Sequence, residues 1–154
     1  MIPKQTFRVL ALICVLGMAL LAVPASADVV EKTFPFKLDE WFDIDYEDGP
    51  LAIHRVRVKT MKGNFKSKVF RPGVDKDPML QDVQVQVEYS NDMSRDIEAH
   101  LEIFWVDSKG RRIDGYDGTE DMDEEERHEL MTSIRSTLVY GLDVAKKLKV
   151  KITF

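Results

Sequence analysis

Strict alternation of apolar and polar side chains is the feature that most limits how this chain can fold. The stretches QDVQVQVEY (81–89), IEAHLEIFW (97–105) and KLKVKITF (147–154) place an apolar residue at every second position. Successive side chains of a β-strand point to opposite faces of the sheet, so each stretch predicts a strand with one buried face. These three strands are the clearest elements in the sequence.

Weaker alternation adds further strands before residue 81. Residues 34–46 and 54–61 alternate in the same way, and Asp48-Gly49-Pro50 forms a turn signal between them. Gly63-Asn64 has the composition of a two-residue hairpin loop, which would place Val58 opposite Val69. The prolines and glycine of 71–78 break any regular element there.

The segment 124–142 is compatible with two structures. Leu130, Ile134 and Leu138 fit helical spacing, but with Thr132 and Ser136 they also fit period two. We favour a strand because the neighbouring strands need a partner. The prediction is therefore an all-β fold, an antiparallel immunoglobulin-like β-sandwich of seven to nine strands, with one short helix near 124–140 as the alternative for that segment.

The first 27 residues resemble a secretory signal peptide. Lys4 and Arg8 precede an apolar run of 15 residues from Val9 to Val23, and Ala25-Ser26-Ala27 has the small residues of a cleavage site. A membrane-spanning helix needs roughly 20 apolar residues, so an uncleaved anchor is the less favoured alternative. Residues 1–27 are thus predicted to be removed on export, leaving one β-sandwich domain at 28–154.

The cleaved chain has no cysteine, because Cys14 leaves with the signal peptide. No disulfide can then stabilise the 127 residues that remain, so the domain has to build a full apolar core. It keeps 20 basic and 27 acidic residues, a net charge of −7. We expect an acidic protein of the periplasm or the extracellular space, with no membrane span in its mature form.

A resemblance to a known family lies in the segment 97–113, IEAHLEIFWVDSKGRRI. A strand rich in aromatic residues, a turn at 107–110 and a basic strand start resemble the FxLYD-type immunoglobulin-like domains of bacterial exported proteins. IFWVD stands where that family has Phe-x-Leu-Tyr-Asp, and of the motif only Asp107 is kept. The likeness covers at most residues 81–154. It implies a small sandwich with a binding or structural role.

Seven basic residues and no acid lie between Leu51 and Arg71. In an otherwise acidic chain such a segment predicts a surface that binds an anionic protein or an anionic component of the cell envelope. Nucleic acid is excluded as a partner by export and by the lack of interleaved aromatic residues. The alternative is that the charges only protect a strand edge. The candidate residues are Arg55, Arg57, Lys59, Lys62, Lys66, Lys68 and Arg71.

The acidic stretch DGYDGTEDMDEEE (114–126) raises the possibility of a calcium site, since calcium prefers several carboxylate oxygens. Counted from Asp114, Glu125 occupies the twelfth position of an EF-hand, but Thr119 stands where glycine is required. We therefore predict that residues 114–129 form a solvated loop, and we expect no cofactor. The alternative is that these residues bind calcium or support a metal-dependent activity. The metal candidates are Asp114, Asp117, Glu120, Asp121 and Asp123.

The two tryptophans have opposite predicted environments. Trp105 shares the parity of the core residues and should be buried, whereas Trp41 shares the parity of Asp43 and Asp45 and is a candidate exposed binding residue. The sequence contains no nucleophile elbow, no phosphate-binding loop and no zinc-protease motif. The resulting expectation is a non-enzymatic interaction module.

Overall fold

The computed structural model describes residues 28–62 and 79–154, which form strands and one short helix. The predicted signal peptide and the predicted hairpin loop lie outside the described residues. The strands are β1 Val29–Pro35, β2 Phe42–Asp48, β3 Leu51–Thr60, β4 Leu80–Asn91, β5 Ile97–Val106, β6 Arg112–Met122, β7 Glu126–Leu138 and β8 Lys147–Thr153, and the helix is α3 Val139–Val144.

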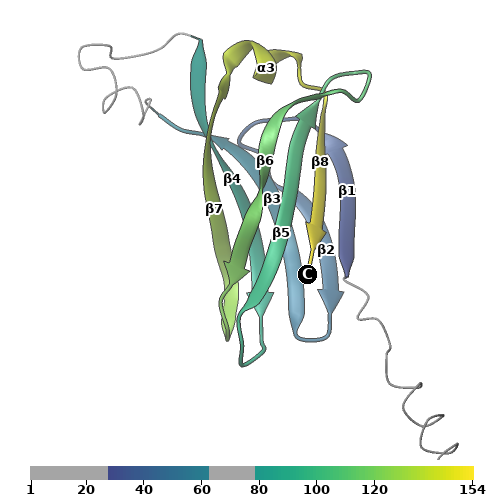
Figure 1. Ribbon diagram of the computed structural model, residues 1–154, viewed down its shortest axis with the longest axis vertical. Helices are drawn as coiled ribbons and strands as arrows, with labels where there is room; N and C mark the ends of the chain where they lie inside the picture. Colours follow the sequence, from purple (N-terminus) through teal and green to yellow (C-terminus); the bar gives the residue numbers. More distant parts are fainter. Residues whose placement is uncertain (1–27, 63–78) are drawn as a thin grey trace, which may run out of the picture.

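The strands form two antiparallel sheets of four strands that pack face to face (Figure 1). The first sheet has the order β1-β8-β5-β6 and the second the order β2-β3-β4-β7. The chain passes from one sheet to the other between β1 and β2, between β4 and β5, between β6 and β7, and through α3 into β8. The predicted all-β antiparallel sandwich is confirmed.

The core fills the space between the sheets with the residues that the alternation selects. Val85 of β4, Leu101 of β5 and Val150 of β8 are all buried. Trp105 is also buried, as its parity predicts, and its ring lies 6.0 Å from that of Phe36. Burying such residues contributes roughly 1.5–3 kcal/mol each, so the apolar core can hold the fold without a cysteine.

The segment with two possible structures is a strand. β7 pairs with β4 in an unbroken register from Leu138 opposite Leu80 to Glu129 opposite Tyr89. The strand prediction is therefore confirmed for 126–138, and the short helix α3 begins only at Val139. Within the described residues no helix is long and apolar enough to cross a membrane.

The pairing predicted for the end of β3 is wrong. Val58 pairs with Val85 of β4 and forms a bridge to Leu38 on its other side. Its predicted partner Val69 lies outside the described residues. A residue of a strand inside a sheet has two neighbours, and at Val58 these are Val85 of β4 and Leu38, which precedes β2.

Candidate functional site

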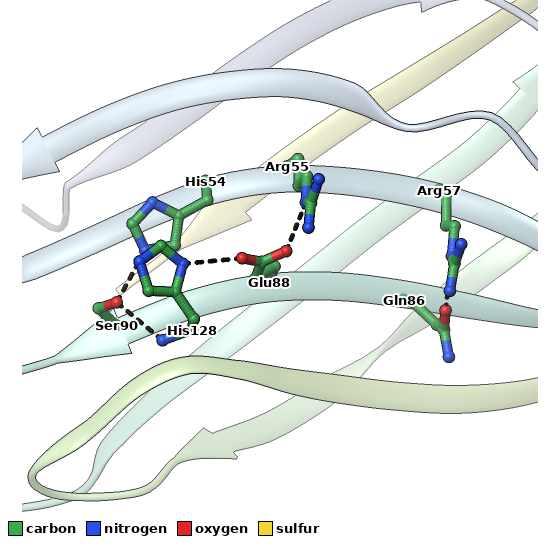
Figure 2. A network of polar contacts seen from close by, with 7 residues as sticks. All are labelled: His54, Arg55, Arg57, Gln86, Glu88, Ser90 and His128. Atoms are coloured by element: carbon green, nitrogen blue, oxygen red, sulfur yellow. Dashed lines mark hydrogen bonds and ion pairs between the residues drawn. The ribbon is translucent and has the colours of Figure 1, made fainter.

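A β-bulge in β3 brings two consecutive side chains to the outer face of the second sheet. Ile53 pairs with Tyr89 and Arg55 pairs with Glu88, so His54 is an extra residue between the two pairs. Such a bulge bends the strand and changes the direction of its side chains. Figure 2 shows His54 and Arg55 both directed towards the polar side chains of β4.

Glu88 is the centre of a polar network on this face. Its side chain is only 8% exposed, and its two carboxylate oxygens accept hydrogen bonds from Arg55 Nε and from His128 Nδ1, the latter at 2.8 Å (Figure 2). Burial raises the pKa of Glu88, but the hydrogen bonds from His128 and Arg55 outweigh burial and hold this pKa below its usual value. Glu88 is therefore a carboxylate that links β3, β4 and β7.

Two histidines and a serine extend the network. His54 Nε2 lies 2.7 Å from Ser90 Oγ, which also accepts a hydrogen bond from the backbone N–H of His128 at 3.1 Å. The two imidazole rings stack with their centroids 4.4 Å apart. In a serine–histidine–acid relay one histidine contacts both the serine and the acid. Here His54 contacts Ser90 while His128 contacts Glu88, so the arrangement differs from that relay.

Trp41 lies beneath the two arginines of β3. The guanidinium carbons of Arg55 and Arg57 lie 4.5 and 4.2 Å from the centroid of its ring. Arg57 Nε also donates to Gln86 Oε1 at 2.7 Å, which fixes the direction of this side chain. Guanidinium groups on an aromatic face gain cation–π attraction and lose conformational freedom. Trp41 is thus half-buried rather than fully exposed, and the predicted exposure is wrong because the arginines cover it.

The basic residues predicted for this surface divide into three groups. Arg55 and Arg57 belong to the network, while Lys59 and Lys62 are exposed near the end of β3. Lys66, Lys68 and Arg71 lie outside the described residues. Asp39 lies close to the second group, where hydrogen bonds from Thr60 lower its pKa and the charges of Lys59 and Arg57 lower it further.

The acidic stretch is not the loop that its composition predicts. Residues 114–122 belong to β6, which pairs with β5 along its whole length, and 126–129 begin β7. Only 123–125 connect the two strands. The prediction failed because a strand that alternates aspartate with glycine and threonine has the composition of a loop, although its outer face is simply solvated.

The five predicted metal ligands point to different places. Asp114 pairs with Arg135 at 3.5 Å, and Glu120 accepts hydrogen bonds from Ser133 and Tyr116, all on the side of β6 that faces β7. Burial raises the pKa of Tyr116, and its bond to Glu120 raises it further. Asp117 and Asp121 lie on the opposite side of the strand, and Asp123 is in the turn. Among the described residues, no three histidine, cysteine or acidic side chains are placed to hold a metal ion.

Hollows at the surface of the described residues include one beside the network and one beside α3. One, of about 320 Å³, borders the network and is lined by His54 and Ser90 together with the ion pair of Arg127 and Asp92, whose atoms are 2.7 Å apart. The other, of about 480 Å³, lies between the start of β6 and α3, with Arg112 and Tyr140 at its walls. The first hollow is a polar extension of the network.

The network itself was missed by the sequence reasoning. Glu88 and His128 are separated by 40 positions, and their contact depends on a register between β4 and β7 that no local pattern encodes. One sequence signal could have indicated the contact: Arg55 and Glu88 have opposite charges and lie on two different predicted strands, and such residues often pair across a sheet.

Comparison with known proteins gives no relative from which a role could be carried over. The resemblance to the FxLYD-type domains stays a prediction. No protein-family model, no curated protein and no solved structure matches this chain.

Proposed function

We propose that this chain is an exported, non-enzymatic interaction module that docks an anionic group of a protein or a cell-envelope component on the outer face of β3. The observation that carries the proposal is the placement of Arg55 and Arg57 over Trp41. Their side chains are fixed before any ligand arrives, which lowers the entropy that binding would otherwise lose.

Arg55 and Arg57 differ in whether a neighbouring carboxylate neutralises their positive charge. Glu88 neutralises Arg55, whereas Arg57 donates from Nε to the neutral amide of Gln86. Among the described residues the Nη atoms of Arg57 have no acceptor, so they can donate to a carboxylate or phosphate in the paired geometry that guanidinium favours. Lys59 follows two positions later on the same strand and adds a second positive charge.

The test compares two double variants that change the net charge equally. Arg57→Glu with Lys59→Glu alters the proposed face, and Lys147→Glu with Lys149→Glu alters β8 in the other sheet. Binding is measured by co-sedimentation with vesicles that contain phosphatidylglycerol and, separately, by retention on immobilised polygalacturonate. Interactions between exposed charges weaken as ionic strength rises, so both measurements are repeated at several salt concentrations.

The proposal predicts that the variant of β3 loses at least about tenfold in affinity for one of the two polyanions, and that salt weakens binding of the unmodified protein. The variant of β8 should bind nearly as well as the unmodified protein. Equal losses in both variants would mean that only net charge matters. Absence of binding to both polyanions would contradict the proposal.

A further inference from the structure

Three of the four edge strands in the described sandwich carry features that prevent further strand pairing. Charges on an edge strand, a proline and a bulge all oppose the addition of another strand. β1 ends at Pro35, and β2 has a bulge between Asp43 and Tyr46. The charged residues that protect these edges are Glu31 and Lys32 on β1, Asp43 and Glu47 on β2, and Asp117 and Asp121 on β6.

β7 has such features only at its start, where 126–129 are charged and the register shifts, and the stretch 130–138 is the exception. Its residues Leu130, Ile134 and Leu138 share the outer face of the second sheet and are 39%, 50% and 54% exposed. The residues between them on this face are Thr132 and Ser136, so the row has no charge. The stretch from 130 to 138 contains no proline, and its register with β4 has no bulge.

Among the strands of residues 28–62 and 79–154, none pairs with the other side of β7. β7 is the last strand in the order of the second sheet, and Figure 1 shows it along the margin of the molecule. An antiparallel edge strand leaves backbone N–H and C=O groups directed outward, where another strand can bind them. The length of the unprotected stretch, roughly 30 Å at about 3.4 Å per residue, is that of a long strand.

The sequence of the stretch indicates what the other strand is. On the outer face, residues 130–138 present Leu-Thr-Ile-Ser-Leu at every second position, an order that is nearly the same in both directions about Ile134. The pairs at equal distance from the centre are Ser133 with Arg135, Thr132 with Ser136, Met131 with Thr137 and Leu130 with Leu138. We propose that a second copy of this chain pairs with β7 in antiparallel orientation, with the two-fold axis at Ile134.

This symmetry places apolar side chains of one subunit opposite apolar side chains of the other on the outer face. A two-fold interface brings the same patch of both subunits together, so a strand whose outer face is nearly symmetric about its centre is complementary to itself on that face. Ile134 would meet Ile134 of the partner subunit, and Leu130 would meet Leu138 of the partner subunit. Cross-strand apolar pairs of this kind stabilise a sheet.

The charges also fit a second copy. Arg135 is the one ionisable side chain between Leu130 and Leu138. In the proposed register it lies opposite Ser133 of the partner subunit, so no like charges face each other directly, and within its own chain it pairs with Asp114 at 3.5 Å. The dimer would join the second sheet of one subunit to the second sheet of the other, forming one continuous sheet.

Sedimentation velocity of the purified protein tests the proposal. The unmodified protein should form a dimer whose fraction rises with concentration over about a hundredfold range, as mass action requires. Ile134→Lys places two like charges at the two-fold axis and should weaken association at least about tenfold. Ile134→Glu should do the same. An equimolar mixture of the two variants should regain the dimer, because a lysine then meets a glutamate.

Thr119→Lys is the matched control, since it introduces the same charge on the outer face of β6. It should leave the dimer unchanged. Thermal unfolding followed by circular dichroism checks that each variant is folded, and the mixture provides a second readout that a simple folding defect would not restore. A monomer at all concentrations, or a dimer that Ile134→Lys leaves intact, would overturn the proposal.

Discussion

Replacing Glu88 by glutamine should destabilise the fold measurably, although the change keeps the shape of the side chain. The glutamine oxygen can accept the hydrogen bond from Arg55, but its neutral amide nitrogen then meets His128 Nδ1, so the carboxylate's hydrogen bonds to two cationic groups are lost. A hydrogen bond to a charged group contributes about 1.5–3 kcal/mol to stability. The side chains of Arg55 and His128 are 42% and 69% exposed, however, and solvent screening lowers such contributions to about 0.2–1 kcal/mol each.

The expected loss for Glu88→Gln is therefore about 1–2 kcal/mol in the free energy of unfolding, because the buried carboxylate lies between these two limits. With a dependence on urea of about 2 kcal/mol per molar, the unfolding midpoint should fall by about 0.5–1 M. Tryptophan fluorescence provides the assay, since Trp105 is buried in the core. The control is Glu98→Gln, which changes an exposed glutamate on β5.

Acid should remove the difference in stability between the unmodified protein and Glu88→Gln. The pKa of Glu88 is lower in the folded chain than in the unfolded one, so its stabilising effect is complete above the unfolded pKa and is lost as the pH falls through the folded pKa. The gap in stability between the unmodified protein and Glu88→Gln should persist at neutral pH and close in acid. A gap equal to that of Glu98→Gln at pH 7, or one that widens in acid, would refute the role assigned to Glu88.

Three further outcomes follow from the structure. Gly115→Ala should destabilise the fold by roughly 2–4 kcal/mol in urea unfolding. A Cβ there would lie 2.3 Å from the backbone carbonyl oxygen of Ile103, and a backbone atom cannot move aside as a flexible side chain can. Tyr89→Phe should lower the unfolding free energy by about 1 kcal/mol in the same assay, since the hydroxyl accepts a 3.0 Å hydrogen bond from the N–H of Asp123. Calcium and a chelator should give melting temperatures within about 1 °C of each other, and a larger rise with calcium would reveal a site that the divergent carboxylates do not indicate.

Periodicity predicted the fold well where one face of a strand is strictly apolar. Val85, Leu101 and Val150 lie in such strands, and each is buried. β7 was harder because its leucine and isoleucine residues lie at positions 130, 134 and 138 of the exposed face, and this spacing satisfied both periods. Pairing with β4, which is a tertiary interaction, decides between the two structures.

The candidate site was predicted only in part. The cluster of basic residues identified Arg55 and Arg57, but their positions depend on Trp41 and Glu88. Trp41 precedes β2, and its burial results from side chains that reach across from β3. A bulge such as that at His54 changes which face a residue occupies, and simple alternation cannot anticipate it.

The position of β8 has a consequence for how the protein is made. β8 is the last strand in the chain order, yet it lies between β5 and β1, and it is the one strand of the described sandwich that pairs with β1. β1 can therefore join this sheet only after β8, more than a hundred residues later in the chain, has been made. The second sheet and the β5–β6 pair consist of strands that precede β8, so only the first sheet waits for it, and removal of β8 would leave β1 without a strand partner and separate it from β5.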